Sequence, residues 1–495
     1  MSRVIKTGAT TTATTAAATR AGAGPQLKAG ALNLTEATVT GLSNMAPAMS
    51  LFFSVNVIAG TIGASLPFVF ILATLGILAT ANTLSQFTRL YPSAGSFVTF
   101  ITRAFNPAVG AVGGTFLICG YTMAAGAVYA VIGGWTADVL HRDLAITIAW
   151  QPLMVIGMVI MAILLVVGVE VSTRAALVLF LFETAVLLLL GIVIVVRQAG
   201  HLSGAPFAPP SGSSGLTGIA TAFALAIFAF VGWEASAPLA EETDNPRRNV
   251  PIALITGVVI LAAVYIFVTY TTVIGFGVNH VDKLAADQTA FSTLAATYLG
   301  PLRGLIDIAG ITSILASTLA LSNTQGRIFF HGGRARIFPS VLGRVNARYH
   351  TPAIAIVTYM IIGTIIVFAA QAWLGAAKLP NDAFSIFGDL ATFGTLPLIL
   401  IYGLTNIALI AHTARHGTRG VNPVTHYVLP AIGAILLLVP VWNFTQPALP
   451  PFDRVIQFTL VILVVSLVYG LVVARLNPAA AEQAGVALSG EGAPR

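Results

Sequence analysis

The chain alternates long apolar runs with short polar segments from about residue 35 to about residue 475. A helix that crosses the hydrocarbon core of a bilayer needs about 20 largely apolar residues, because each residue adds about 1.5 Å to its length. The pattern therefore predicts an all-α membrane protein with twelve transmembrane helices. We expect these helices at about residues 35–60, 65–88, 107–137, 149–169, 175–197, 216–240, 251–275, 303–327, 353–373, 385–411, 424–443 and 453–475.

The composition of the chain supports the bilayer as its solvent. Of the 495 residues, 57% are hydrophobic and only 8% are charged, whereas a soluble globular domain carries about 25% charged residues. Residues 1–33 and 477–495 lack long apolar runs, so we expect two disordered cytoplasmic tails there. The single cysteine, Cys119, excludes an intrachain disulfide bond and a cysteine-based metal cluster.

The basic residues indicate how the chain is oriented. A net charge of +7 would also suit nucleic acid, but the Lys and Arg residues lie in short loops, so no nucleic-acid partner is expected. With both termini in the cytoplasm, 18 of the 24 Lys and Arg residues fall on the cytoplasmic side of the bilayer and six on the other side. This bias obeys the positive-inside rule and predicts a multi-pass protein of the cell (inner) membrane.

Two of the predicted helices contain interruptions. The first carries NMAPAMS at residues 44–50, with a proline at mid-membrane, and the sixth carries AFVGWE at residues 229–234, with a glycine next to a carboxylate. Each one alone is typical of a proline kink or a packing glycine. Together they occupy the first position of two successive five-helix sets, where inverted-repeat transporters place broken helices and their substrate.

We therefore expect a substrate site between the two interruptions, with an aromatic residue of the third helix beside it. The expected substrate-binding residues are Asn44, Met45, Ala46, Pro47, Ala48, Met49, Tyr121, Phe230, Val231, Gly232, Trp233 and Glu234. For Glu234 two roles stay open. It can face the substrate, or it can accept hydrogen bonds from free N–H groups at the start of the second half-helix.

Glu183 is an isolated carboxyl group about eight residues into the fifth predicted helix. An apolar environment disfavours the charged form of a carboxyl group, so we expect Glu183 to be neutral at rest. A carboxyl group that gains and loses a proton as access alternates is suited to proton coupling. The alternative is a protonated glutamate that is hydrogen-bonded to a neighbouring helix.

Four other polar residues in the predicted helices are weaker candidates. Asp307 and Asp389 lie near the outer ends of the eighth and tenth helices, where they are either gate residues or interfacial residues. Ser317 and Thr318 offer adjacent hydroxyl groups for sodium, although such hydroxyls more often bond to the backbone. No other metal site and no cofactor is expected, because nucleotide-binding, zinc-binding and nucleophile-elbow motifs are missing.

Four segments resemble the amino acid–polyamine–organocation (APC) superfamily of permeases. These are RLYPSAGSFVTFITRAFNPAVG at 89–110, GVEVSTRAALVLFLFE at 168–183, FAFVGWEASAPLAEETDNPRRNVPIAL at 228–254 and QGRIFFHGGRARIFPSVLGRVNARYHTP at 325–352. The resemblance covers about residues 35–475. It implies a LeuT-like fold with two inverted five-helix repeats, at 34–200 and 215–412, and two further helices at 420–476. It also implies alternating access, no enzymatic activity, and a site between helices 1, 3, 6, 8 and 10.

The chain departs from the family pattern at two positions. Glu183 stands where some members carry a lysine that takes the place of a sodium ion, so a proton, or else sodium, is the expected coupling ion. The first interruption has a proline in place of the glycine-rich stretch of many amino-acid permeases, as in a branch that includes putrescine importers. We expect a proton-coupled amino-acid symporter. An amine or polyamine importer, or an amino acid/amine exchanger, is the alternative, and both monomer and homodimer stay open.

Overall fold

The computed structural model describes residues 32–92, 96–168, 173–210, 215–241, 243–334, 336–373, 382–417, 420–445 and 454–476. The predicted tails lie outside these ranges, apart from Leu32 and Asn33. The helices, in chain order, are α2 (Leu34–Asn44), α3 (Pro47–Phe52), α4 (Val55–Ile62), α5 (Leu66–Leu90), α6 (Ser96–Ala104), α7 (Pro107–Leu144), α8 (Trp150–Val167), α9 (Thr173–Arg197), α10 (Gly215–Phe230), α11 (Pro246–Phe276), α12 (Val281–Ala286), α13 (Ala290–Tyr298), α14 (Gly304–Arg334), α15 (Ala353–Trp373), α16 (Ala383–His416), α17 (Leu429–Asn443) and α18 (Val455–Leu476).

The predicted all-α membrane fold is confirmed. Within the described ranges, eleven helical segments are long and apolar enough to cross a membrane, and a bent pair formed by Leu34–Phe52 and Val55–Ile62 raises the number to twelve. The same ranges contain no strand, only an isolated bridge between Leu32 and Thr243. This bridge holds the start of α2 beside the segment that leads into α11.

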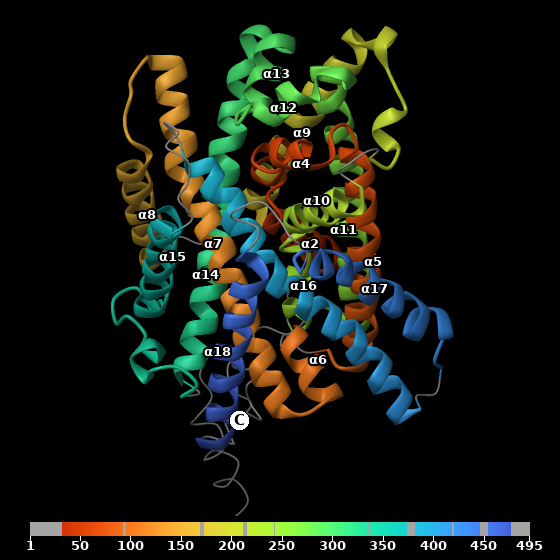
Figure 1. Cartoon of the computed structure of the whole chain (residues 1–495). Helices are drawn as coiled ribbons and strands as arrows, with labels where there is room; N and C mark the ends of the chain where they lie inside the picture. The colour runs from red at the N-terminus through yellow and green to blue at the C-terminus, as the bar shows by residue number, and fades with distance from the viewer. Residues whose placement is uncertain are drawn as a thin grey trace, which may run out of the picture.

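Three short helices lie outside the predicted transmembrane segments. Helix α6 is amphipathic and buries Phe97, Val98, Phe100 and Ile101, while α12 and α13 have six and nine residues. None of them is long enough to cross a bilayer. Helices α12 and α13 lie at one end of the helix bundle and α6 lies at the other (Figure 1).

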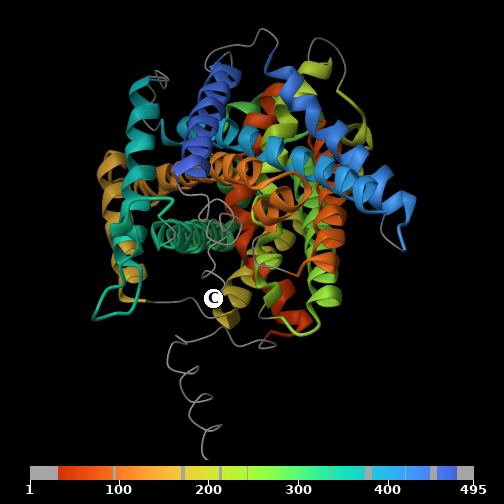
Figure 2. The ribbon, with the colours of Figure 1, turned by 90° about the horizontal axis from the view of Figure 1, so that it is seen from below.

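The burial of the long helices separates the centre of the bundle from its edge. Within its most apolar stretch, α7 is 94% buried, whereas the corresponding stretches of α8 and α18 are only 28% buried. Ile156, Ile160 and Ile163 of α8 are all exposed. An apolar face of this kind would be an aggregation liability in water, but it is satisfied by lipid. Figures 1 and 2 both show α8 and α15 together at one edge of the bundle.

Candidate functional site

The first transmembrane segment is interrupted where the sequence predicts. Helix α2 ends at Asn44 and α3 begins at Pro47, with Ala46 between them in the left-handed region at φ 41°. That conformation costs a non-glycine residue about 1–2 kcal/mol. Proline fits the first position of a helix because the missing N–H group has no helical partner there. A second bend, of 58°, separates α3 from α4.

The sixth segment is interrupted beside the first. Helix α10 ends at Phe230, Gly232 has φ 104°, and the chain continues as two 3₁₀ turns, Trp233–Ser236 and Pro238–Glu241. A Cβ atom on Gly232 would lie 2.8 Å from the backbone oxygen of Asn44. The two interruptions therefore touch, and glycine is required both by the backbone angle and by the close approach.

Side chains from three other helices form hydrogen bonds with backbone N–H and carbonyl groups at the interruptions. The Met49 N–H group donates to the Ser313 hydroxyl oxygen of α14 at 3.0 Å, and the Ala48 N–H group donates to the Glu183 carboxyl group of α9. The hydroxyl group of Tyr265 in α11 donates to the Ala229 carbonyl oxygen at 2.7 Å. An unsatisfied buried group costs about 1–3 kcal/mol, so these contacts stabilise the broken geometry.

A cavity of about 160 Å³ lies beside the two interruptions. Its wall is formed by parts of α2, α3, α6, α7, α10, α14 and the 3₁₀ segment after Gly232. Most lining side chains are apolar, and none of the lining residues that the structure describes is Lys, Arg or His. The charged lining residue is Glu234.

The position of Glu234 is compatible with both roles that the sequence leaves open. It is 7% exposed and lines the cavity, while one of its carboxylate oxygens accepts the Gly232 N–H group at 3.3 Å. The Tyr121 hydroxyl group donates to the other oxygen. The aromatic ring of Tyr402 packs against the ring of Trp233, the residue before Glu234, with ring centroids 5.9 Å apart. A buried carboxylate whose hydrogen-bond donors are neutral is a strong partner for a cation.

The expected substrate-binding residues divide into two groups. Those that line the cavity are Asn44, Met45, Met49, Tyr121, Val231, Gly232 and Glu234, together with the sodium candidate Ser317. Those that are buried elsewhere in the core are Ala46, Pro47, Ala48, Phe230 and Trp233. They shape the two interruptions without contributing to the cavity wall.

The hydroxyl groups of Ser317 and Thr318 both bond within α14. They donate to the carbonyl oxygens of Ser313 and Ile314, at 2.7 and 2.8 Å. This is the backbone bonding that the sequence offers as the alternative to sodium.

Several lining residues were missed by the sequence analysis. They include Phe97 and Val98 of α6 and Gln325 of α14. The apolar pairs Phe97–Val98 and Phe100–Ile101 recur at helical spacing in SFVTFITRA, which is a signal for the amphipathic helix α6. It does not reveal that this short helix lines the cavity.

Glu183 lies behind the first interruption rather than in the cavity wall. It is 2% exposed, and its carboxyl group is hydrogen-bonded by Ser313 and by the Ala48 N–H group. Among the residues that the structure describes, none is hydrogen-bonded to its Oε2 atom. A change in the charge of Glu183 would therefore act directly on the backbone at the start of α3.

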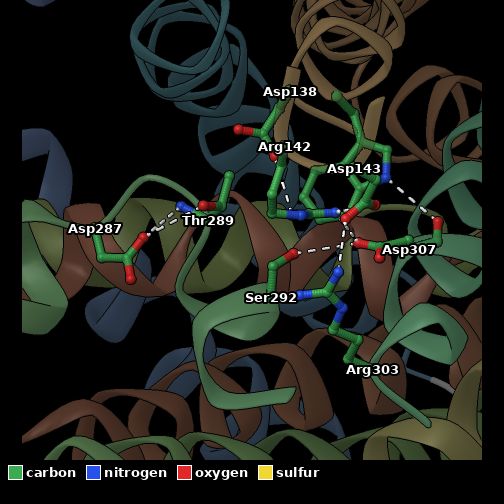
Figure 3. Close-up of polar contacts among 9 residues, drawn as sticks. Asp138, Arg142, Asp143, Asp287, Thr289, Ser292, Arg303 and Asp307 are labelled. Carbon is green, nitrogen blue, oxygen red and sulfur yellow. Dashed lines mark hydrogen bonds and ion pairs between the residues drawn. The ribbon is translucent and has the colours of Figure 1, made fainter. Parts of the chain in front are cut away.

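An ion-pair network lies at the end of the bundle that carries α12 and α13, away from α6, and Figure 3 shows it. Arg142, near the end of α7, pairs with Asp307, near the start of α14, at 2.6 Å and with Asp138 at 3.1 Å. Arg303 pairs with Asp143 at 3.2 Å. The second gate candidate, Asp389, is buried in α16 and takes no part in these ion pairs. The network therefore joins α7 to α14 on the side of α12 and α13.

Comparisons with known proteins agree on one family. Residues 36–477 match the family model described as amino acid permease. The branched-chain amino acid permease BcaP of Bacillus subtilis is 28% identical over 71% of this chain and 75% of its own length. The low-affinity putrescine importer PlaP of Escherichia coli is 26% identical over 75% of this chain and 80% of its own length. The human b(0,+)-type amino acid transporter 1 is 27% identical over 46% of this chain and 45% of its own length.

Proposed function

Because this chain belongs to the amino acid permease family, a family of membrane transporters, we propose that it carries an amino acid across the cytoplasmic membrane. Transport proceeds by alternating access and is coupled to protons. The observation that carries the proposal is Glu234, a buried carboxylate in a cavity between two broken helices. It is placed to pair with the ammonium group of a substrate.

The remaining lining groups suit the rest of a zwitterion. The side-chain amide of Gln325 can donate to a carboxylate, and Leu117, Val128 and Leu321 form an apolar wall. The hydroxyl groups of Ser50 and Ser317 already donate to backbone carbonyl oxygens. A pocket with a few convergent polar groups on an apolar wall is typical of small-molecule sites.

An amine or polyamine without a carboxylate is the second candidate. The described lining residues include an acidic side chain but no basic one, and this balance favours a cation over a zwitterion. The match to a putrescine importer points the same way. In this case Glu234 is the main determinant of affinity, and the neutral polar groups contribute little.

Proton coupling is assigned to Glu183. A proton that leaves its carboxyl group adds a negative charge next to the Ala48 N–H group, and a proton that returns removes the charge. Both steps change the stability of the broken segment that borders the cavity. The coupling device and the substrate site thus share the first interruption.

The cavity wall and the ion-pair network support a state that is open toward the cytoplasm. The wall includes α6 and the C-terminal half of α14, while Arg142 and Asp307 join α7 and α14 at the other end. The positive-inside bias of the sequence favours a cytoplasmic position for the α6 end and for both chain termini.

Uptake into proteoliposomes tests this function. The panel contains leucine, lysine, putrescine and ethanolamine, each with and without an imposed pH gradient. We expect saturable uptake of one class, with accumulation only when the lumen is more alkaline than the medium. Uptake of none of these compounds would reject the proposal, and uptake of putrescine without any amino acid would establish the second candidate.

A further inference from the structure

The backbone N–H groups at the two interruptions are the first candidates to hold the carboxylate of a substrate, but their hydrogen bonds are already made. The N–H groups of Ala48 and Met49 donate to side chains of α9 and α14, and the Gly232 N–H group donates to Glu234. None of the described lining residues is Lys, Arg or His. The negative end of a zwitterion must therefore meet donors elsewhere in the cavity wall.

The start of α6 supplies such donors. Ser96, Phe97 and Val98 are the first three residues of this nine-residue helix, and all three line the cavity. The first N–H groups of a helix have no intrahelical partner, and their partial positive charge attracts anions. Helix α6 therefore presents its positive end to the cavity.

Two buried polar side chains of the cavity wall are without a partner. Ser96 is 8% exposed and Gln325 of α14 is 2% exposed, and both line the cavity. Among the described residues, none is hydrogen-bonded to Ser96 Oγ or to Gln325 Oε1. The hydroxyl group can rotate, and a half turn of the amide exchanges its oxygen and nitrogen, so both side chains can donate to an anion. Because an unpaired buried polar group is unfavourable, a ligand that pairs with these groups gains affinity.

Contacts at both ends hold α6 in this position. The guanidinium group of Arg415 in α16 donates to the Ala104 carbonyl oxygen, in the last residue of α6, at 2.8 Å. The ring of Phe97 packs against the ring of Trp233, with centroids 6.3 Å apart, and Trp233 directly precedes Glu234 in the chain. The start of α6 therefore lies close to the segment that carries the proposed partner of the ammonium group.

We propose that Ser96, Gln325 and the N-terminus of α6 form the subsite for the carboxylate of the transported amino acid. This proposal rests on the proposed function, in which Glu234 pairs with the ammonium group. The carboxylate oxygens accept hydrogen bonds from the Ser96 hydroxyl group, from the Gln325 amide and from the first N–H groups of α6. An amine without a carboxylate leaves all of these donors unpaired, so the subsite selects amino acids over amines.

Competition for uptake by the full-length protein in proteoliposomes tests the subsite. The probes are the amino acid of the panel that is transported, leucine or lysine, and its carboxamide. The carboxamide keeps the ammonium group and the side chain but has no negative charge at the carboxyl end. We expect the wild-type protein to bind the amino acid at least tenfold more tightly than the carboxamide, because hydrogen bonds to a charged acceptor are stronger than those to a neutral one.

Two variants locate the contact. Ser96→Ala and Gln325→Met each remove a polar group with little change of shape, and each should lower the ratio of the two affinities about tenfold. Thr99→Val is the control, because it removes a hydroxyl group of α6 that lies outside the cavity wall, and it should leave the ratio unchanged. The ratio separates a lost carboxylate contact from a general structural defect, since a defect weakens both probes alike.

The possible outcomes distinguish the subsite from the proposed function. If an amino acid is transported and the ratio is the same in both variants as in the wild-type protein, the subsite is wrong and the proposed function stands. Equal affinity of the wild-type protein for the amino acid and its carboxamide would have the same meaning. If one variant does not fold, the other decides. Uptake of amines alone would reject the proposed function, and the subsite with it.

Discussion

At the scale of single residues, Gly232 is constrained both by its backbone angle and by its neighbour. Its φ of 104° and the 2.8 Å approach of Asn44 leave no room for a side chain. Replacement by alanine must strain the backbone by roughly 1–2 kcal/mol or separate the two interruptions.

We expect Gly232→Ala to raise the KM for uptake about tenfold or more, because such strain corresponds to about a tenfold change in an equilibrium. Initial uptake rates in proteoliposomes measure it. Gly403→Ala is the control, since a Cβ atom there meets no atom within 4 Å. Unchanged KM in Gly232→Ala would show that the contact between the interruptions does not shape the site.

Glu234 is the residue on which substrate recognition depends in the proposed function. Glu234→Gln keeps the shape of the side chain but removes its charge. Hydrogen bonds to charged groups contribute about 1.5–3 kcal/mol, so we expect an affinity loss of about tenfold to a hundredfold. Equilibrium binding of the transported substrate measures the change.

Glu36 provides the matched control for this charge. It is a carboxylate of the capping box at the start of α2 and lies outside the cavity. Glu36→Gln should leave substrate affinity unchanged. Equal affinity in Glu234→Gln and in the wild-type protein would remove Glu234 from the binding site.

At the scale of elements, α9 meets the first interruption through Glu183. We expect Glu183→Gln to bind substrate but to lose accumulation driven by a pH gradient, because glutamine cannot exchange a proton. Uptake with and without the gradient measures the difference. Thr184→Val changes the next residue of α9 and should leave the dependence of substrate accumulation on the pH gradient intact. An intact response of Glu183→Gln to the gradient would exclude this residue as the coupling group.

Helices α7 and α14 meet through Arg142 and Asp307. Their side chains are 27% and 13% exposed, so water screens the pair and we expect a coupling energy of about 0.5–1 kcal/mol. A double-mutant cycle of Arg142→Gln and Asp307→Asn in thermal unfolding measures it. Additive effects of the two substitutions would show that the pair does not hold these helices together.

The long helices could be predicted from the sequence, and the contacts of their polar residues could not. Apolar length alone identifies spans such as α8 and α15, because the bilayer requires it. The sequence also indicates that Glu183 is buried. It gives no sign that Glu183 meets Ser313 and Ala48, because these residues lie on different helices and the meeting depends on packing.

The two interruptions were predicted at the correct positions because proline and glycine act locally. Pro47 removes a donor, and Gly232 supplies the positive φ. Which neighbours line the cavity depends on how the half-helices turn. Phe230 and Trp233 accordingly face the core, while Val231, between them in sequence, lines the cavity with Gly232.

At the scale of the whole molecule, the helices at the centre of the bundle are buried along most of their length, and the helices at its edge expose apolar residues to lipid. Helix α7 is buried along its apolar length, and α8 and α18 face outward. The proposed substrate cavity lies within this arrangement, between the α6 end and the ion-pair network of α7 and α14. The predicted repeats at 34–200 and 215–412 each begin with an interrupted helix, and their inverted relation stays a prediction.

The central claim is that the two interruptions and Glu234 together hold the substrate. An experimental structure with the transported substrate bound tests it most directly. We expect its ammonium group within hydrogen-bonding distance of the Glu234 carboxylate, in the cavity beside Asn44 and Gly232. A substrate bound elsewhere, with this cavity empty or with either helix continuous through Ala46 or Gly232, would contradict the claim.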